Sequence, residues 1–268
     1  MKHSIRTKNR FQRSYHKIQE RYLPFLPKTP IGLIKNSKIF FKINLLKKKN
    51  EWRKIPEKII RDELEFHQKN QKKLEDLQIA SDLEHLFRFI INTEKIDGDI
   101  LELGTYRGGS AILMADLLKR MNSEKKIYAC DGFIGLPYDD KFSRDKNSKG
   151  KFSDTNFQYV KNKIQKMGYD KSIEIIKGLF EETLESRLSS KKFSFVMIDC
   201  DIYDSTIQSL DFVFPRLEKN GIIFFQNYSR KNIDDPRWGE TRAVNDFFGK
   251  KNLTINLKPV PHFVNQQF

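Results

Sequence analysis

Cysteine and long apolar runs are both scarce in this sequence. The two cysteines, Cys130 and Cys200, are too few for a disulfide framework and fit a reducing compartment. No uncharged run exceeds ten residues, about half of what a transmembrane helix needs, so no segment is expected to span a bilayer. The N-terminal MKHSIRTKNR also lacks the apolar segment of a secretory signal. These absences predict a cytoplasmic protein.

Acidic residues are scarce in the first fifth of the chain, where 16 Lys and Arg face only Glu20 and Glu51. Residues 1–54 thus carry +14 of the formal net charge of +15, and the rest of the chain is nearly neutral. A nucleic-acid enzyme is expected to be positive around its active site as well, so the near-neutral body argues against that class. The basic arm, residues 1–54, could contact nucleic acid, an anionic surface or another subunit, or be a solvated tail.

Regular elements are predicted from about residue 56 onward. Residues 56–77 predict a charged helix with a thin apolar stripe, and a second helix follows from about Ser81. Apolar runs then occur at 100–103, 127–130, 173–176, 193–198 and 222–225. Helical patterns separate them at 109–121, 154–167, 180–190 and 204–218. Such alternation predicts a parallel sheet covered on both faces.

The last apolar runs, 253–257 and 260–264, have no helix between them and predict a terminal antiparallel pair. The fold class is therefore α/β, a Rossmann-like doubly wound sheet of seven strands with a helical, basic N-terminal extension. We expect three parts: the basic arm (1–54), N-terminal helices that form a lid or a subunit contact (55–96), and a ligand-binding domain (97–268). A homo-oligomer is expected.

Ligands of such sheets bind beyond the carboxyl ends of the strands. After the first strand, Gly104, Gly108 and Ser110 form a glycine-rich turn that opens a helix, a site for a carboxylate or another anion, although such glycines can be mere turns. After the second strand, Asp131 suits the two hydroxyls of a ribose, or alternatively caps a turn before Gly132. After the third strand, Gly178 and Phe180 could accommodate a nucleobase.

The fourth strand is followed by Asp199 and Asp201, two carboxylates that are costly to bury unless they have partners or a function. One could anchor a cation or ligand while the other accepts a proton. The fifth strand ends at Gln226 and Asn227, whose amide oxygens face the same edge of the sheet. Substrate contacts are expected from Tyr203, Tyr228, Trp238 and Arg242; Arg242 suits an anionic group, and a packing role for Trp238 is equally open.

Five segments carry a family resemblance: GDILELGTYRGGSAILMA, CDGFIGLP, KGLFEETL, IDCDIYDST and WGETRAVNDFF. Together they resemble the macrocin O-methyltransferase (TylF-like) family of class I S-adenosylmethionine-dependent methyltransferases, over roughly residues 80–268. The resemblance implies methyl transfer to a hydroxyl, commonly on a sugar ring. The small-molecule acceptor is therefore expected to be sugar-like. A catalytically impaired cofactor-binding protein and a nucleic-acid methyltransferase remain the alternatives.

The resemblance also implies residue roles. Asp201 would be the base that deprotonates the acceptor, and Asp199 the first metal-binding carboxylate. The cofactor would be held by the residues that follow the strands: Glu102, Gly104, Thr105, Tyr106, Gly108, Ser110, Asp131, Gly132, Phe133, Gly178, Phe180 and Asp199. The family's other metal ligands are usually two adjacent acids, for which this sequence has Gln226 and Asn227. Because two negative charges are missing, we expect Mg²⁺ to bind weakly or not at all.

Overall fold

The computed structural model describes residues 57–78, 80–142, 147–228, 239–250 and 263–265. The chain divides into two units, Met1–Lys54 and Ile55–Phe268, and all described residues belong to the second. The predicted basic arm therefore lies outside the described residues, as do Trp238 and the predicted strand at 253–257.

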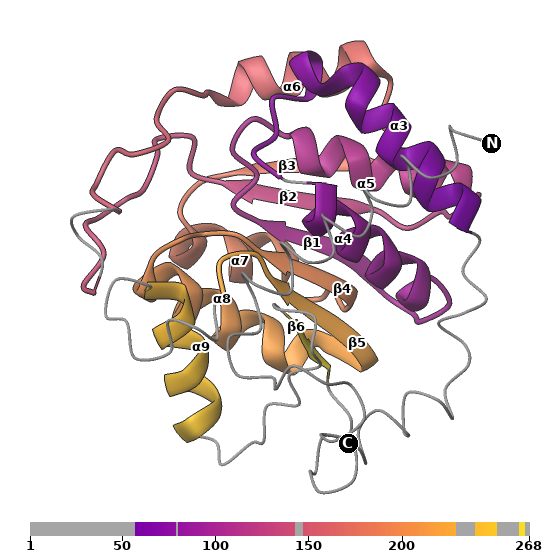
Figure 1. Ribbon diagram of the computed structural model, residues 1–268. Coiled ribbons are helices and arrows are strands. Elements are labelled where there is room, and N and C mark those ends of the chain that lie inside the picture. Colours follow the sequence, from indigo (N-terminus) through magenta and orange to yellow (C-terminus); the bar gives the residue numbers. More distant parts are fainter. Residues whose placement is uncertain (1–56, 79, 143–146, 229–238, 251–262, 266–268) are drawn as a thin grey trace, which may run out of the picture. The chain divides into compact units, whose positions relative to one another are not determined.

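A mixed sheet forms the centre of the second unit, with strand order β3-β2-β1-β4-β5-β6 (Figure 1). The first five strands are parallel to their neighbours, and the short β6 is antiparallel to β5. Their bounds are Asp99–Leu103 (β1), Ile127–Asp131 (β2), Ile173–Lys177 (β3), Phe193–Ile198 (β4), Leu217–Phe225 (β5) and Phe263–Asn265 (β6). The five predicted parallel strands are confirmed.

The prediction of seven strands is not supported, because the described residues form six. The predicted pairing of 253–257 with 260–264 is not supported either. The C-terminal strand instead adds to β5, where Val264 lies opposite Ile223. The strand order reverses between β1 and β4, and this is where an open α/β sheet leaves a crevice for a ligand.

Helices cover both faces of the sheet, as predicted. Their bounds are Glu57–Leu74 (α3), Ala80–Thr93 (α4), Gly109–Arg120 (α5), Phe157–Met167 (α6), Phe180–Leu188 (α7), Tyr203–Val213 (α8) and Gly239–Lys250 (α9). On one side, α4 packs on β4 and β5, and α5 packs on β2 and β3. On the other side α7, α8 and α9 form a layer (Figure 1). The predicted helix at 204–218 ends early, at Val213, and a 3-10 turn containing Pro215 follows.

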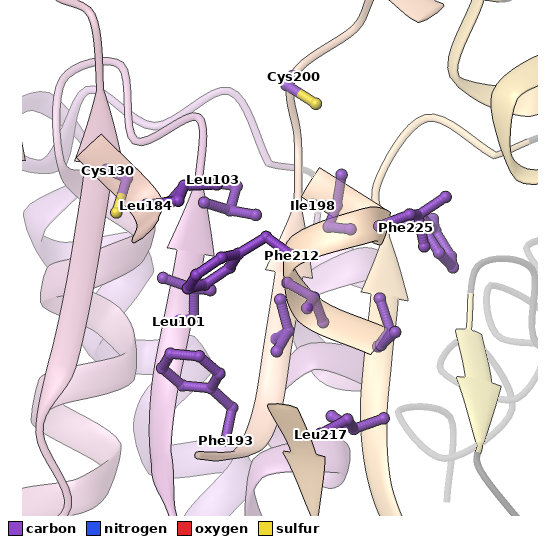
Figure 2. Close-up of a cluster of buried hydrophobic side chains, with 14 of the residues drawn as sticks. Leu101, Leu103, Cys130, Leu184, Phe193, Ile198, Cys200, Phe212, Leu217 and Phe225 are labelled. Atoms are coloured by element: carbon purple, nitrogen blue, oxygen red, sulfur yellow. The ribbon is translucent and has the colours of Figure 1, made fainter. Parts of the chain in front are cut away.

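The core between the sheet and α7–α9 is built from side chains that alternate along the strands. Leu101 and Leu103 of β1 face Phe193 of β4 and Phe212 of α8 in this cluster (Figure 2). Cys130 also lies in the cluster and is buried, a packing role rather than a chemical one. The side chain of Glu102 lies on the opposite face of β1, toward α5, where it accepts the Ser110 hydroxyl. No helix in the described ranges is long and apolar enough to cross a membrane.

Helix α3 is attached to α5 through buried charges. Arg120 of α5 lies 2.5 Å from Glu63 Oε1 and 2.8 Å from Asp116 Oδ2. Glu63 is fully buried, and burial with the nearby charge of Asp116 raises its pKa to about 8. The connection from α3 to α4 then runs across the carboxyl edge of the sheet, toward the site described below.

Candidate active site

A cleft that is partly open to solvent lies at the carboxyl ends of β1, β2, β3 and β4. Concave sites at this edge of an open α/β sheet are the usual place for a small-molecule ligand. Several residues that the sequence predicts as site residues line the cleft: Gly104, Tyr106, Asp131, Gly132, Gly178, Phe180, Asp199 and Asp201. The crevice at the reversal of strand order is therefore open rather than filled with side chains.

Glycine is required where the loop after β1 passes the end of β4. Gly104 has φ +95°, and a Cβ there would lie 1.9 Å from the carbonyl oxygen of Asp199. Gly108 has φ +76° at the start of α5, where a Cβ would lie 2.8 Å from Val160. Both positions combine a left-handed backbone with close packing, so the turn has little room for side chains.

The hydroxyl groups of this loop are used inside the protein. Thr105 Oγ1 donates to Glu102 Oε2 at 2.5 Å, and the Ser110 hydroxyl donates to the other oxygen of Glu102. All three residues are buried, and burial raises the pKa of Glu102 to about 7. Glu102, Thr105, Gly108 and Ser110 are not among the residues that line the cleft. In this structure these four residues support the loop from inside the protein and do not face the cleft.

Asp131 ends β2 and orders the rim of the cleft. Its Oδ2 accepts the backbone N–H of Tyr106 at 2.8 Å, and its Oδ1 accepts that of Phe133 at 2.7 Å. Burial raises the pKa of Asp131, although backbone hydrogen bonds from Phe133, Tyr106 and also Thr105 lower it. A carboxylate has about four acceptor positions, so acceptor capacity remains toward the cleft. Phe133 takes part only through its backbone, because its buried ring packs against Phe157.

Aromatic rings border the cleft on two sides. Phe180 begins α7 directly after Gly178, and both line the cleft. Across from the first loop, Phe152 lies edge-on to Tyr106 with a centroid separation of 5.7 Å. Phe152 and Tyr138 belong to the long segment between β2 and α6, and the sequence analysis did not identify them. The segment's two sides are joined by backbone hydrogen bonds between Leu136 and both Gly150 and Lys151.

The carboxylates after β4 are held by amide groups. Asn227 Nδ2 donates to Asp199 Oδ1 at 3.0 Å and lies 3.4 Å from Asp201 Oδ1. Gln78 Nε2 donates to Asp199 Oδ2 at 3.2 Å, and Gln226 Nε2 donates to Gln78 Oε1 at 3.1 Å. The structure thus brings together all four polar residues predicted after β4 and β5. Gln78, from the connection between α3 and α4, was not predicted.

The two carboxylates differ in their surroundings. Burial, together with the charges of Asp201 and Glu102, raises the pKa of Asp199 well above its usual range. Asp201 has a left-handed backbone with φ +62° and lines the cleft. Burial raises its pKa to about 6, while the charge of Lys151 lowers it and that of Asp140 raises it. A carboxylate of this kind is a stronger base than a solvated one and is still ionised at neutral pH.

Glu240 is a further acid that the sequence analysis did not single out. It lies in the first turn of α9, is almost fully buried, and accepts the backbone N–H of Asn227 at 2.8 Å. Burial and the charges of Asp199 and Asp201 raise its pKa well above the usual range. Glu240 therefore fixes the position of Asn227 from behind.

The three described residues that were predicted to contact the substrate lie in different environments. Tyr228 is buried and bonds to Asn245 of α9, so it is a core residue in this structure. Tyr203 begins α8, where its backbone N–H donates to Asp140 at 2.6 Å and its hydroxyl donates to Asp246. Arg242 is exposed within α9, bonds to Asp246 and lies over the ring of Phe142. None of these three is among the residues that line the described cleft.

The donor set after β4 and β5 does not fit Mg²⁺. Magnesium takes oxygen ligands and usually binds through one or two carboxylates. Of the three predicted ligands only Asp199 is an acid, and both of its oxygens accept N–H groups. Asn227 directs its nitrogen, not its oxygen, toward Asp199. Among the described residues no group of three or more His, Cys, Asp and Glu is arranged to hold a metal ion.

Comparison with known protein families gives a match over residues 71–263 to the family described as macrocin-O-methyltransferase (TylF). This match spans well over half of the chain. The chain belongs to the macrocin O-methyltransferase (TylF) family. By family it is an S-adenosylmethionine-dependent O-methyltransferase, as the motifs predict.

Two curated relatives illustrate the range of this similarity. One is the 8-demethyl-8-(2,3-dimethoxy-alpha-L-rhamnosyl)-tetracenomycin-C 4'-O-methyltransferase of Streptomyces olivaceus, 23% identical over 197 residues, which cover 70% of either chain. The other is the mycinamicin III 3''-O-methyltransferase of Micromonospora griseorubida, 23% identical over 143 residues. That match covers 50% of this chain and 56% of the relative, little more than half its length.

Solved structures support the fold. The O-methyltransferase NovP matches with a TM-score of 0.54 at 20% identity, covering 68% of this chain and 76% of that chain. The calicheamicin methyltransferase CalS11 matches with a TM-score of 0.55 at 18% identity, covering 91% and 99%. At these identities the likeness shows a shared Rossmann-like methyltransferase fold.

Proposed function

We propose that this protein transfers the methyl group of S-adenosylmethionine to a hydroxyl of a sugar or a sugar-containing metabolite. The observation that carries the proposal is a single open cleft that joins Asp131, a hydroxyl acceptor, to Asp201, a buried base. Family membership supports the reaction type. The acceptor class is supported by relatives whose names specify a rhamnosyl tetracenomycin and mycinamicin III.

The residues that line the cleft fit the parts of this cofactor. Asp131 keeps acceptor capacity for ribose hydroxyls, and Gly104 lines the cleft beside it. The apolar stretch from Leu179 to Phe180 suits the adenine ring. When bound, the cofactor supplies a methyl group on a positively charged sulfur, which makes that carbon electrophilic.

Asp201 is the base in this proposal. An acceptor hydroxyl beside it would give its proton to the carboxylate, and the oxygen would use the freed electron pair to form the new O–CH₃ bond. The methyl–sulfur bond would break as this bond forms, and its electron pair would stay on the sulfur of the leaving S-adenosylhomocysteine. The raised pKa makes Asp201 a better proton acceptor than an ordinary aspartate. General-base catalysis of this kind contributes about 10²- to 10⁴-fold to a rate. The rings of Tyr106 and Phe152 line the same cleft.

The test is transfer of a labelled methyl group from S-adenosylmethionine to a panel of rhamnosides and nucleotide sugars. We expect Asp201→Asn to lower kcat at least about 100-fold while binding of S-adenosylhomocysteine stays the same. Asp204→Asn is the matched control, because Asp204 lies three positions after Asp201 as the second residue of α8, pairs with Lys141 and is not a cleft residue. Full turnover by Asp201→Asn would contradict the base assignment.

Absence of cofactor binding by the wild-type protein would contradict the whole proposal. Cofactor binding without methyl transfer to any acceptor would favour the impaired cofactor-binding protein, an alternative that the amides at Gln226 and Asn227 keep open.

A further inference from the structure

Each oxygen of the Asp199 carboxylate accepts a hydrogen bond from an amide side chain of the protein. Its Oδ1 accepts Asn227 Nδ2 at 3.0 Å, and its Oδ2 accepts Gln78 Nε2 at 3.2 Å. Each oxygen of Asp199 thus already accepts an N–H group, with which an incoming cation would have to compete.

One amide group serves both acids. Asn227 Nδ2 carries two N–H groups and lies 3.0 Å from Asp199 Oδ1 and 3.4 Å from Asp201 Oδ1. It therefore lies between two carboxylates, where a shared divalent ion would otherwise reduce their repulsion. Asn227 is fixed in this position because its backbone N–H donates to the buried Glu240.

The orientation of Gln78 is fixed as well. Its oxygen accepts Gln226 Nε2 at 3.1 Å, which leaves its own nitrogen to face Asp199. Reversing the amide of Gln78 or Asn227 would bring a carbonyl oxygen to about 3 Å from a carboxylate oxygen, without a hydrogen between them. The three amides therefore form a hydrogen-bonded network that ends at Asp199. Gln226 donates to Gln78, and both Gln78 and Asn227 donate to the carboxylate.

We propose that the amide N–H groups of Asn227 and Gln78 replace the divalent cation in this site, so that methyl transfer requires no metal. This inference rests on the proposed function. To bind a divalent ion, Asp199 would have to release two hydrogen bonds, and both amides would have to turn. The ion would then find the carboxylates of Asp199 and Asp201 with neutral amide oxygens, two negative charges fewer than a site with acids in place of Gln226 and Asn227.

A positive charge near the acids comes from Lys151. This residue lies on the segment between β2 and α6, donates to Asn147 Oδ1 at 3.0 Å, and is the cation whose charge lowers the pKa of Asp201. Asn147 in turn lies 3.5 Å from the carbonyl oxygen of Asp201. Lys151 therefore places a positive charge of the protein itself near Asp201.

The experiment measures binding of Mn²⁺ by electron paramagnetic resonance, in which only the free ion gives the sharp signal. For the wild-type protein we expect no binding up to about 1 mM, since the donor set is poor. The Gln226→Asp/Asn227→Asp double variant, which adds two carboxylates, should bind Mn²⁺ at least about 10-fold more tightly. Asp199→Asn in that background should remove the gain. Wild-type methyl transfer should be equal in EDTA and in MgCl₂.

Two results would overturn the inference. One is wild-type Mn²⁺ binding below about 100 μM that Asp199→Asn abolishes, which corresponds to a genuine site of roughly 5 kcal/mol. The other is activity that EDTA removes and Mg²⁺ restores. Since Mn²⁺ binding needs neither acceptor nor cofactor, it decides the question by itself. Failure of S-adenosylhomocysteine to bind would instead count against the proposed function. If the double variant does not fold, the wild-type titration and Asn227→Asp alone remain decisive.

Discussion

The substitution Asp131→Asn tests the predicted ribose contact. The carboxylate accepts backbone N–H groups from Tyr106 and Phe133, one on each oxygen, and a hydrogen bond from the Thr105 backbone also opposes the rise of its pKa on burial; acceptor capacity remains for a ligand hydroxyl. In asparagine one oxygen becomes an NH₂ group that cannot accept. The variant therefore loses one charge-assisted hydroxyl contact, worth about 1.5–3 kcal/mol. Because 1.4 kcal/mol corresponds to a factor of ten, we expect the Kd for S-adenosylhomocysteine to rise about 10- to 100-fold.

The assay is calorimetry with two ligands, S-adenosylhomocysteine and its 2′-deoxyribose analogue. If Asp131 holds the hydroxyls, the deoxy analogue binds wild type more weakly, and Asp131→Asn discriminates much less between the two ligands. A loss caused by distortion of the loop would instead weaken both ligands equally in the variant. Asp154→Asn is the control, because Asp154 accepts the Tyr106 hydroxyl at 2.8 Å outside the cleft. Undiminished discrimination by Asp131→Asn would refute the ribose contact.

Three further predictions concern the base, the first loop and the α3–α5 contact. Because Asp201 works as a base only when ionised and its pKa is raised from 3.8 to about 6, kcat/KM should fall as pH drops through about 6, which a pH–rate profile measures. Gly104→Ala should cost about 3 kcal/mol in urea unfolding, whereas Gly168→Ala, also left-handed but with nothing within 4 Å, should cost about 1 kcal/mol. Equal costs would contradict the packing argument. Because the pKa of Glu63 is about 8, Arg120→Met leaves an unpaired buried charge only at alkaline pH, where it should cost about 3 kcal/mol. The loss should be smaller at pH 7, where the acid is mostly protonated, than at pH 9; a loss independent of pH would contradict this.

The sequence predicted the sheet well because its parallel strands are buried on both faces. Such strands read as short, uniformly apolar runs, and β4 matches its predicted range of 193–198. The prediction was wrong at the ends of elements where that signal fails. Strand β5 begins at Leu217, five residues before the predicted start, because its first part contains the exposed Lys219 and Asn220. These polar residues hide the strand from a hydrophobic pattern.

Within the site, the sequence located residues that directly follow strands and missed residues that reach the site from elsewhere. Asp131, Asp199 and Asn227 follow strand ends, so topology alone brings them together. Gln78 lies 121 positions from Asp199 in a connection without periodicity, and no local pattern marks it. Glu240 was visible as part of WGETRAVNDFF, but its contact with Asn227 depends on how α9 packs. Thr105 and Ser110 are predicted to hold the cofactor, and in the structure their hydroxyls bond to Glu102.

A crystal structure of the protein with S-adenosylhomocysteine and a rhamnose-containing acceptor tests the central claim most directly. We predict that the ribose hydroxyls lie within hydrogen-bond distance of the Asp131 carboxylate and that an acceptor hydroxyl contacts Asp201. A cofactor bound away from the ends of β1 and β2, or an acceptor hydroxyl with no path to Asp201, would contradict the account.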